Sequence, residues 1–297
     1  MIDFIKIYYR DKSIFEPFVT EEKNFKNLYQ TLEMHTGELS YPARTKLESM
    51  DVVVSGKSGY VKNSIHKLYN VLESGDDHNH NDFTYFMLCD CIDYLSNNLL
   101  DINEADITQL EFGLNINVEI PAEIIIKRNV LMYQEKGYNH NRKYYGKGEL
   151  KQFDRYNYFF KIYDKAKQYG LDQNIIRFEL KFIRKKQIQD LGVYSLYDLK
   201  NKRILRKLFA LLLKRFDELI IVDSIIDYSV LDEKDLNKLN SYKNPEFWEE
   251  LKVSKSRATK SRKLKDFKRI LDKYNLLKTK TTLRNSLIQK YIFLINN

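Results

Sequence analysis

The stretch from residue 110 to residue 118 constrains the fold most, because apolar and polar residues alternate there without a break. Leu110, Phe112, Leu114, Ile116 and Val118 alternate with Glu111, Gly113, Asn115 and Asn117. Successive side chains of a β-strand point to opposite faces of the sheet. The alternation therefore predicts a strand with one apolar face and one face of carboxylate and amide groups.

Other segments extend this prediction to an α+β fold. Residues 2–9 and 50–55 have strand character, and residues 156–163 and 174–183 are aromatic and β-branched, as strands are. A short turn-like segment, 167–172, joins the last two strands, which favours an antiparallel pair. Residues 82–100, 205–217, 246–253 and 263–274 have helical periodicity. We expect an antiparallel sheet with flanking helices over residues 1–200, followed by a smaller, basic, all-helical domain over residues 201–297.

Charge is distributed unevenly along the 297 residues. Residues 1–100 hold 10 basic and 15 acidic side chains, a net charge of −5, whereas residues 201–297 hold 23 and 12, a net charge of +11. A basic end on a nearly neutral body indicates attachment to a polyanion, although a solvated, lysine-rich helical tail has the same composition. The hydrophobic fraction of 43% is large enough for a buried core, which argues against disorder.

The sequence gives no sign of a membrane span or a disulfide. No apolar run approaches the roughly 20 residues that a span needs, and Met1 leads directly into a strand-like segment. Cys89 and Cys91 are one residue apart on an expected helix, a spacing that suits neither a disulfide nor a zinc pair. We expect a soluble, untargeted cytoplasmic protein with reduced thiols.

Two carboxylates stand out because each lies in the middle of an expected strand. Glu111 lies on the polar face of residues 110–118, and Glu179 lies in the strand around NIIRFELKFI. A buried carboxylate requires a partner. Together the two could share a divalent cation, with Asn115 as a further oxygen ligand. Alternatively, each pairs with a basic residue such as Arg177 or Lys161.

Tyr163 is a candidate nucleophile, since it ends an expected strand and is followed by Asp164 and Lys165. A phenol attacks phosphate only when a base, a metal or a cation favours the phenolate. Lys165 and a nearby metal could supply that help. Spacing alone does not distinguish Tyr163 from the other 21 tyrosines, most of which will only pack.

The histidines and a basic segment are further candidates. His78 and His80 flank Asn79 in a polar stretch that could hold a metal but has no apolar residue to place it in a sheet. His66 lies beside Lys67 and could contact phosphate, or could simply pack. Residues 252–269 contain nine Lys or Arg and one acidic residue, interleaved with hydroxyls that also contact phosphate. This segment is either a nucleic-acid surface or a solvated face.

In order along the chain, five motifs resemble the replication initiators of filamentous phages, the gene II protein family, and related plasmid initiators and relaxases. They are VSGKSGYVKNSIHKLYN at 54–70, HNHNDFTY at 78–85, LEFGLNINV at 110–118, FKIYDKAKQYG at 160–170 and IIRFELKF at 175–182. A strand that ends in IYDK and is soon followed by a strand that carries RFE is the most distinctive pair. The resemblance covers about residues 1–200.

The resemblance implies an endonuclease that nicks one DNA strand, stays linked to the 5′ phosphate through a tyrosine, and later rejoins the displaced circle. It implies Tyr163 as the nucleophile and Glu111 and Glu179 as ligands of Mg²⁺ or Mn²⁺. The residue pattern adds Lys165 as an aid to Tyr163 and Asn115 as a further metal ligand. DNA contacts are expected from His66, Lys67, Lys161, Arg177, Lys255, Arg257, Lys260, Arg262, Lys263 and Lys265. Expected partners are single-stranded and duplex origin DNA, a host helicase and a single-strand-binding protein in a bacterial cytoplasm, but no membrane. The protein would act as a monomer or dimer.

Two departures from the broader initiator pattern leave alternatives open. The chain has no His–hydrophobic–His strand, and the lysine follows Tyr163 at +2 rather than +3. Tyr194 and Tyr197, in DLGVYSLYDL, therefore remain rival nucleophiles. A conjugative relaxase would use the same chemistry, and in a non-catalytic DNA-binding repressor or scaffold the same residues would be only structural.

Overall fold

The computed structural model describes residues 1–140, 146–225 and 227–297. In these residues the chain builds a large sheet of nine strands in the order β2-β3-β4-β5-β1-β6-β10-β9-β8, with antiparallel neighbours. The strands are β1 (Ile2–Tyr9), β2 (Tyr29–Leu32), β3 (Leu39–Leu47), β4 (Met50–Val54), β5 (Gly59–Ser64), β6 (Asp106–Asn117), β8 (Leu150–Asp154), β9 (Tyr158–Asp164) and β10 (Ile175–Phe182). The predicted α+β class is confirmed, and β9 and β10 form the expected antiparallel pair.

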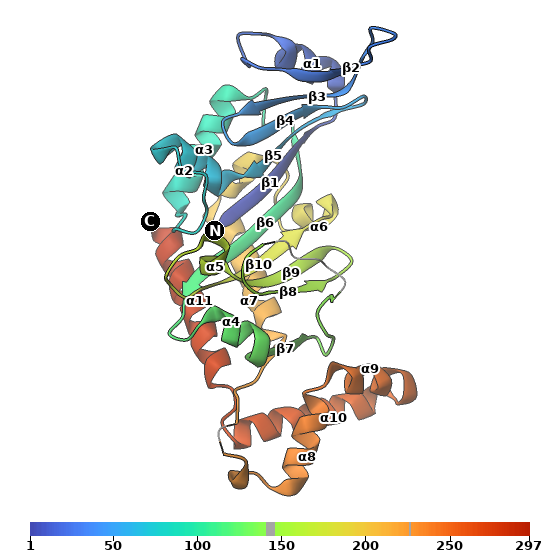
Figure 1. Cartoon of the computed structure of the whole chain (residues 1–297), viewed down its shortest axis with the longest axis vertical. Coiled ribbons are helices and arrows are strands. Elements are labelled where there is room, and N and C mark those ends of the chain that lie inside the picture. The colour runs from blue at the N-terminus through green and yellow to red at the C-terminus, as the bar shows by residue number, and fades with distance from the viewer. Residues whose placement is uncertain (141–145, 226) are drawn as a thin grey trace.

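The strand that dominated the sequence pattern, β6, lies in the centre of the sheet between β1 and β10. Its apolar face packs against two long helices, α7 (Lys202–Asp217) and α11 (Lys278–Asn296), which lie behind the sheet in Figure 1. Phe178 of β10 and Phe216 of α7, for example, meet with ring centroids 5.2 Å apart. Burial of this face supplies the main stabilisation of the body of the molecule.

The remaining α-helices of the body connect or cover the strands. They are α1 (Lys12–Thr20), α2 (Ile65–Ser74), α3 (Tyr85–Asn98), α4 (Ala122–Ile124), α5 (Lys165–Tyr169) and α6 (Lys185–Asp190). Helix α5 forms at the beginning of the expected turn between β9 and β10 and ends at Gly170, whose φ of 68° is a left-handed conformation that glycine adopts without steric penalty. A second, two-stranded sheet pairs β7 (Val130–Tyr133) with β11 (Leu219–Ile221).

Residues 223–225 and 227–276, which we call the arm, project from the body and build a second hydrophobic cluster, to which Met132 of β7 and Val222 also contribute. The arm contains α8 (Glu233–Tyr242), α9 (Pro245–Ser254) and α10 (Arg257–Lys273), at the bottom of Figure 1. Their apolar side chains, among them Tyr242, Trp248 and Phe267, form a cluster separate from the main core. Residues 201–297 thus contribute to both cores, because α7 and α11 pack in the main one.

The arm leaves and rejoins the body at one place. The backbone N–H of Asp223 donates to the carbonyl of Leu276 at 2.9 Å, which holds the two chain segments of this neck together. From the neck, α11 runs back along the body (Figure 1). Across the described ranges, no helix is both long and apolar enough to cross a lipid bilayer.

Candidate active site

Three neighbouring strands place their polar residues on one face of the sheet, opposite α7 and α11. Glu179 of β10 lies opposite Gly113 of β6 on one side and Lys161 of β9 on the other. Two residues before Glu179 on β10, Arg177 lies opposite Asn115 of β6 on one side and Tyr163 of β9 on the other. The alternation in sequence therefore becomes a cluster in space, because directly opposed residues on adjacent strands share a face.

Gly113 permits the close approach of β6 and β10 at the position of Glu179. A Cβ at residue 113 would lie 2.7 Å from the carbonyl oxygen of Phe178 and 3.0 Å from the Cα of Glu179. Backbone atoms cannot yield to such a contact as a flexible side chain could. A glycine is therefore required here for the two strands to pair in this register.

Three buried carboxylates meet at the centre of the polar face. Asp3 of β1, Glu111 of β6 and Glu179 of β10 are 4%, 8% and 1% exposed, and each offers an oxygen within 4.8 Å of the others. We call them the acidic trio. Asp3 was not predicted, although the same reasoning that selected Glu111, a carboxylate inside an apolar strand, applies to it.

Two cations bridge the trio. Lys161 Nζ lies 2.8 Å from Glu179 Oε1 and 3.1 Å from Glu111 Oε1, while Arg177 donates from Nε to Glu179 Oε2 at 2.8 Å and from Nη2 to Asp3 Oδ2 at 3.2 Å. The ion pairs that the sequence offered as an alternative to metal ligation are thus present.

These neighbours set the ionisation of each acid. Burial alone would raise the pKa of Glu179 and of Asp3, but the nearby cations, Lys161 and Arg177 for Glu179 and Arg177 and Lys165 for Asp3, hold both pKa values below their ordinary range. Burial and the charge of Glu179 raise the pKa of Glu111 instead.

The acidic trio fits a divalent cation. Its donors are all carboxylate oxygens, which Mg²⁺ and Mn²⁺ prefer, and the Lys161 ammonium already occupies a cation position between Glu111 and Glu179. Asn115 is differently engaged, since its Oδ1 accepts a hydrogen bond from Arg177 Nη1 at 2.9 Å. In this arrangement Asp3, rather than Asn115, completes the oxygen donors, and an incoming ion would compete with Lys161.

This competition leads to a prediction for the full-length chain. We expect Lys161→Met to bind Mn²⁺ at least about tenfold more tightly than the unmodified protein, because the variant leaves two carboxylates without their shared counter-ion. Electron paramagnetic resonance of free Mn²⁺ measures the affinity directly. Lys185→Met, which removes a more exposed ion pair with Asp106, serves as the control. Equal or weaker Mn²⁺ binding by Lys161→Met would rule out the competition.

Tyr163 stands at the edge of this cluster with its hydroxyl toward the trio. Its Oη donates to Glu179 Oε2 at 3.3 Å, and burial, followed by the charge of Glu179, raises the pKa of the phenol well above its ordinary value. Lys165 is 1% exposed, and its Nζ lies 5.5 Å from the Tyr163 ring centre and donates to Asn79 Oδ1 at 2.6 Å. Burial lowers the pKa of Lys165 to about 8.

A cavity of about 410 Å³ opens beside Tyr163 and brings the candidate chemistry together. Its lining includes all three acids of the trio and also Ser64, Lys67, Asn79, Lys161, Tyr163, Lys165, Gln168 and Tyr169. The rival tyrosines do not line it. Tyr194 is 59% exposed, and Tyr197 shares a hydrogen bond with Ser96. Lys67, which was expected to contact DNA, is at the cavity and pairs with Asp77.

Two of the expected DNA contacts have structural partners instead. His66 is 3% exposed, shares a hydrogen bond with Asn81 at 2.6 Å and stacks on Phe83, and burial lowers its pKa to about 3. Arg177 is also 3% exposed, and its side chain donates hydrogen bonds to Glu179, Asn115 and Asp3. Both side chains are therefore buried and engaged within the protein.

The six predicted basic residues of the C-terminal segment lie on or just before α10. Lys255, Arg257, Arg262 and Lys265 are exposed and have no ion pair within the described residues. The other two basic side chains already have partners within the protein. Lys260 pairs with Glu135 of the body at 2.8 Å, and Lys263 lies over the rings of Tyr242 and Phe247. Lys268 adds an exposed cation that was not predicted.

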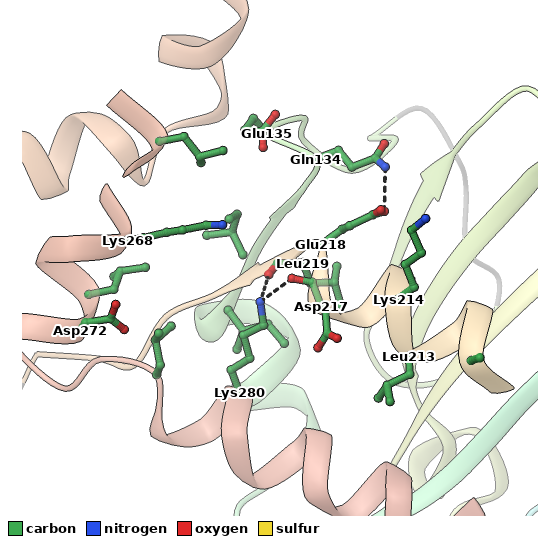
Figure 2. Close-up of a pocket in the computed structure, with 16 residues that line it drawn as sticks. Gln134, Glu135, Leu213, Lys214, Asp217, Glu218, Leu219, Lys268, Asp272 and Lys280 are labelled. Carbon is green, nitrogen blue, oxygen red and sulfur yellow. Dashed lines mark hydrogen bonds between the residues drawn. The ribbon is translucent and has the colours of Figure 1, made fainter. Parts of the chain in front are cut away.

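A larger cavity, about 920 Å³, lies elsewhere, at the joint between the arm and the body (Figure 2). Its lining is mixed, with apolar residues of α7 and α10 beside Lys214, Asp217, Lys268 and Lys280. Lys280 Nζ donates to the carbonyls of Asp217 and Leu219 at 2.8 Å and 2.6 Å and so ties α11 to the end of α7. None of the candidate catalytic residues lines this cavity, so its size does not make it the active site.

Comparisons with known proteins give little independent guidance. No family model and no curated protein matches the chain. A solved structure of a rolling circle replication initiator protein from Geobacillus stearothermophilus is similar in arrangement over 82% of this chain and 96% of that chain. Its sequence is 12% identical and the TM-score is 0.42. A likeness at this level assigns no function and no residue role, so both must come from the site itself.

Proposed function

We propose that this chain is a DNA-strand nickase that initiates rolling-circle replication of a phage or plasmid, with Tyr163 as its covalent nucleophile. The observation that carries the proposal is the contact between the Tyr163 hydroxyl and Glu179 of a buried acidic trio, at the wall of a cavity that also contains Lys165. A nucleophile, a proton acceptor and a cation are thus within reach of one another.

The chemistry follows from these positions. Tyr163 Oη attacks the phosphorus of a phosphodiester and passes its proton to the Glu179 carboxylate, to which it is already hydrogen-bonded. The bond from phosphorus to the 3′ oxygen breaks, and this oxygen takes a proton from the Lys165 ammonium, whose pKa of about 8 suits it to donate near neutral pH. The product is a 5′-phosphotyrosine and a free 3′ hydroxyl. In the reverse reaction a 3′ hydroxyl attacks the ester and rejoins the strand.

A divalent ion held by Asp3, Glu111 and Glu179 would polarise the phosphate for this attack. Lys67, Lys161 and Tyr163 contribute to the reaction independently of the ion. Lys67 and Lys161 offer positive charge to the phosphate oxygens, and the buried position of Tyr163 excludes water from the ester.

The proposal is tested with the full-length chain, a labelled library of single-stranded oligonucleotides with a random centre, and Mn²⁺. We expect a protein–DNA complex that survives detergent and heat and disappears when the sample contains a chelator. Detergent-labile binding alone would favour the DNA-binding repressor or scaffold. A conjugative relaxase would give the same adduct, and the genes that flank the recovered target sequence would distinguish the two.

We further propose that the arm binds duplex DNA through the exposed face of α10. Each phosphate of duplex DNA that a basic side chain neutralises adds about 0.9 to the slope of log affinity against log salt, because counter-ions are released there. We expect the triple change Arg262→Gln, Lys265→Gln and Lys268→Gln to lower this slope by about 2 to 3 and to weaken duplex binding at least about tenfold at physiological salt.

A matched control removes three cations elsewhere, through Lys23→Gln, Lys26→Gln and Lys57→Gln near the N-terminal end, and should leave the slope unchanged. An unchanged slope in the α10 variant would make the basic segment only a solvated face. Full-length variants are preferable to a chain that ends at residue 200, because that truncation would remove α7 and α11 from the main core.

A further inference from the structure

The loop between α2 and α3 carries two histidines, His78 and His80, that the proposed chemistry does not use. Between them, Asn79 is 6% exposed and fixes the loop to the active site. Its Nδ2 donates to both carboxylate oxygens of Asp3, at 2.9 Å and 2.8 Å, and its Oδ1 accepts from Lys165 at 2.6 Å. The middle residue of the loop is therefore anchored to the acidic trio.

The backbone on either side of Asn79 is held as firmly. Asn70 Nδ2 donates to the carbonyl of His78 at 2.7 Å, and Asn115 Nδ2 donates to the carbonyl of His80 at 3.1 Å. The two imidazoles lie together, with ring centres 4.1 Å apart and planes inclined by 18°. The loop thus presents a preformed pair of parallel, half-buried rings, and no large conformational change is needed to assemble it.

Tyr169 connects this pair to the cavity. Its ring lies 5.2 Å from that of His80 and lines the cavity that contains Tyr163. Lys165 lies between Tyr163 and Tyr169, because its Nζ is 5.5 Å from the ring centre of Tyr163 and 5.1 Å from that of Tyr169. A row of aromatic rings therefore begins at the cavity wall and continues over His80 to His78.

Metal binding does not explain the two histidines. Within the described residues, the acidic trio is the only group of three or more His, Cys, Asp or Glu side chains placed to share an ion, and neither His78 nor His80 belongs to it. Burial, followed by the neighbouring His78, also lowers the pKa of His80, which favours a neutral imidazole. A neutral ring offers an aromatic face rather than a charge.

We propose that His78, His80 and Tyr169 form a stacking platform for an unpaired nucleobase of the strand whose phosphate enters the cavity. Bases stack on aromatic rings whatever their identity, so the platform would hold a single strand without selecting its sequence. Only the identity of the entering strand rests on the proposed function. Paired bases cannot use the platform, because they are already stacked in a duplex.

The test measures binding alone, with the full-length protein in a chelator so that no strand is cut. The probe is a 12-nucleotide oligothymidylate with one 2-aminopurine, whose fluorescence falls when the base stacks. We expect the unmodified protein to quench the probe, His80→Ala to weaken binding about tenfold and lose most of the quenching, and His80→Phe to retain both. His35→Ala changes an exposed histidine in the turn between β2 and β3 and should have no effect.

Thermal unfolding first establishes that each variant is folded. The proposal is overturned if His80→Ala quenches and binds like the unmodified protein, or if a folded His80→Phe is as defective as His80→Ala, since the ring would then act through its nitrogens. If His80→Ala does not fold, quenching by the unmodified protein and by His80→Phe still decides the matter. Quenching without any covalent adduct in Mn²⁺ would support the platform and contradict the nickase, whereas an adduct without quenching would do the reverse.

Discussion

Replacement of Tyr163 by phenylalanine should abolish the covalent protein–DNA adduct, a loss of at least about a thousandfold, while single-strand binding stays within about twofold. In the proposed mechanism Tyr163 Oη is the atom that attacks phosphorus, and the variant lacks it. Its effect on folding should be small, because within the described residues it removes one hydrogen bond, to Glu179, which is 3.3 Å long, and a net loss of about 1 kcal/mol is expected. A denaturing gel with labelled oligonucleotides in Mn²⁺ measures the adduct.

Tyr156→Phe is the matched control, because this tyrosine lies two residues before the same strand and is 80% exposed. It should form the adduct at the normal rate. An adduct that persists in Tyr163→Phe and vanishes in Tyr194→Phe or Tyr197→Phe would transfer the nucleophile to one of those residues. Peptide mapping of the nucleotide-linked tyrosine decides between them without any substitution.

Glu179→Gln should remove both Mn²⁺ binding and strand cleavage. Glu179 accepts from Lys161, Arg177 and Tyr163 at once, so the change removes the counter-charge of two cations and, in the proposed mechanism, a metal ligand and a proton acceptor. Breaking a buried ion pair costs about 3 to 5 kcal/mol of folding stability, and retention of the amide oxygen should keep the loss near the low end. We expect Mn²⁺ affinity to fall at least about a hundredfold by electron paramagnetic resonance.

Glu111→Gln should also lower Mn²⁺ affinity but should reduce folding stability less. The pKa of this acid is raised, so the fold stabilises its charged form less than that of Glu179. Glu119→Gln, an exposed change just beyond β6, is the control for both. Wild-type cleavage by a folded Glu179→Gln at limiting Mn²⁺ would exclude this residue as a ligand. Urea denaturation separates a lost site from a lost fold.

The sequence alone was enough to predict the elements around which the site is built. Strict alternation from residue 110 to residue 118 predicts a strand with a polar face, and the structure places that strand in the centre of the sheet. The IYDK and RFE segments predict two further strands, and their short connection predicts that they pair antiparallel. These features are local, since they depend on periodicity and on turn length.

Only the tertiary structure decided which polar residues meet. Asp3 comes from the first strand and joins Glu111 and Glu179 because β1 lies beside β6, a neighbour relation that no local pattern encodes. The same is true of Gly113, whose missing side chain matters only because Glu179 lies directly opposite. The ion pairs of the two predicted acids with Lys161 and Arg177 likewise became visible only with the strands in register.

The C-terminal third shows the same limit for helices. Its periodicity predicts amphipathic helices but does not say what covers their apolar faces. The sequence therefore predicts the same kind of helix for α7 and for α10. In the structure α7 packs on the sheet, whereas α10 packs in the arm. The exposed cations of α10 lie on the face that this packing leaves free. Sequence determines the local conformation and the faces of each element, because these depend on neighbours along the chain. The partner of each face depends on which distant segment buries it best, and that is a property of the whole fold.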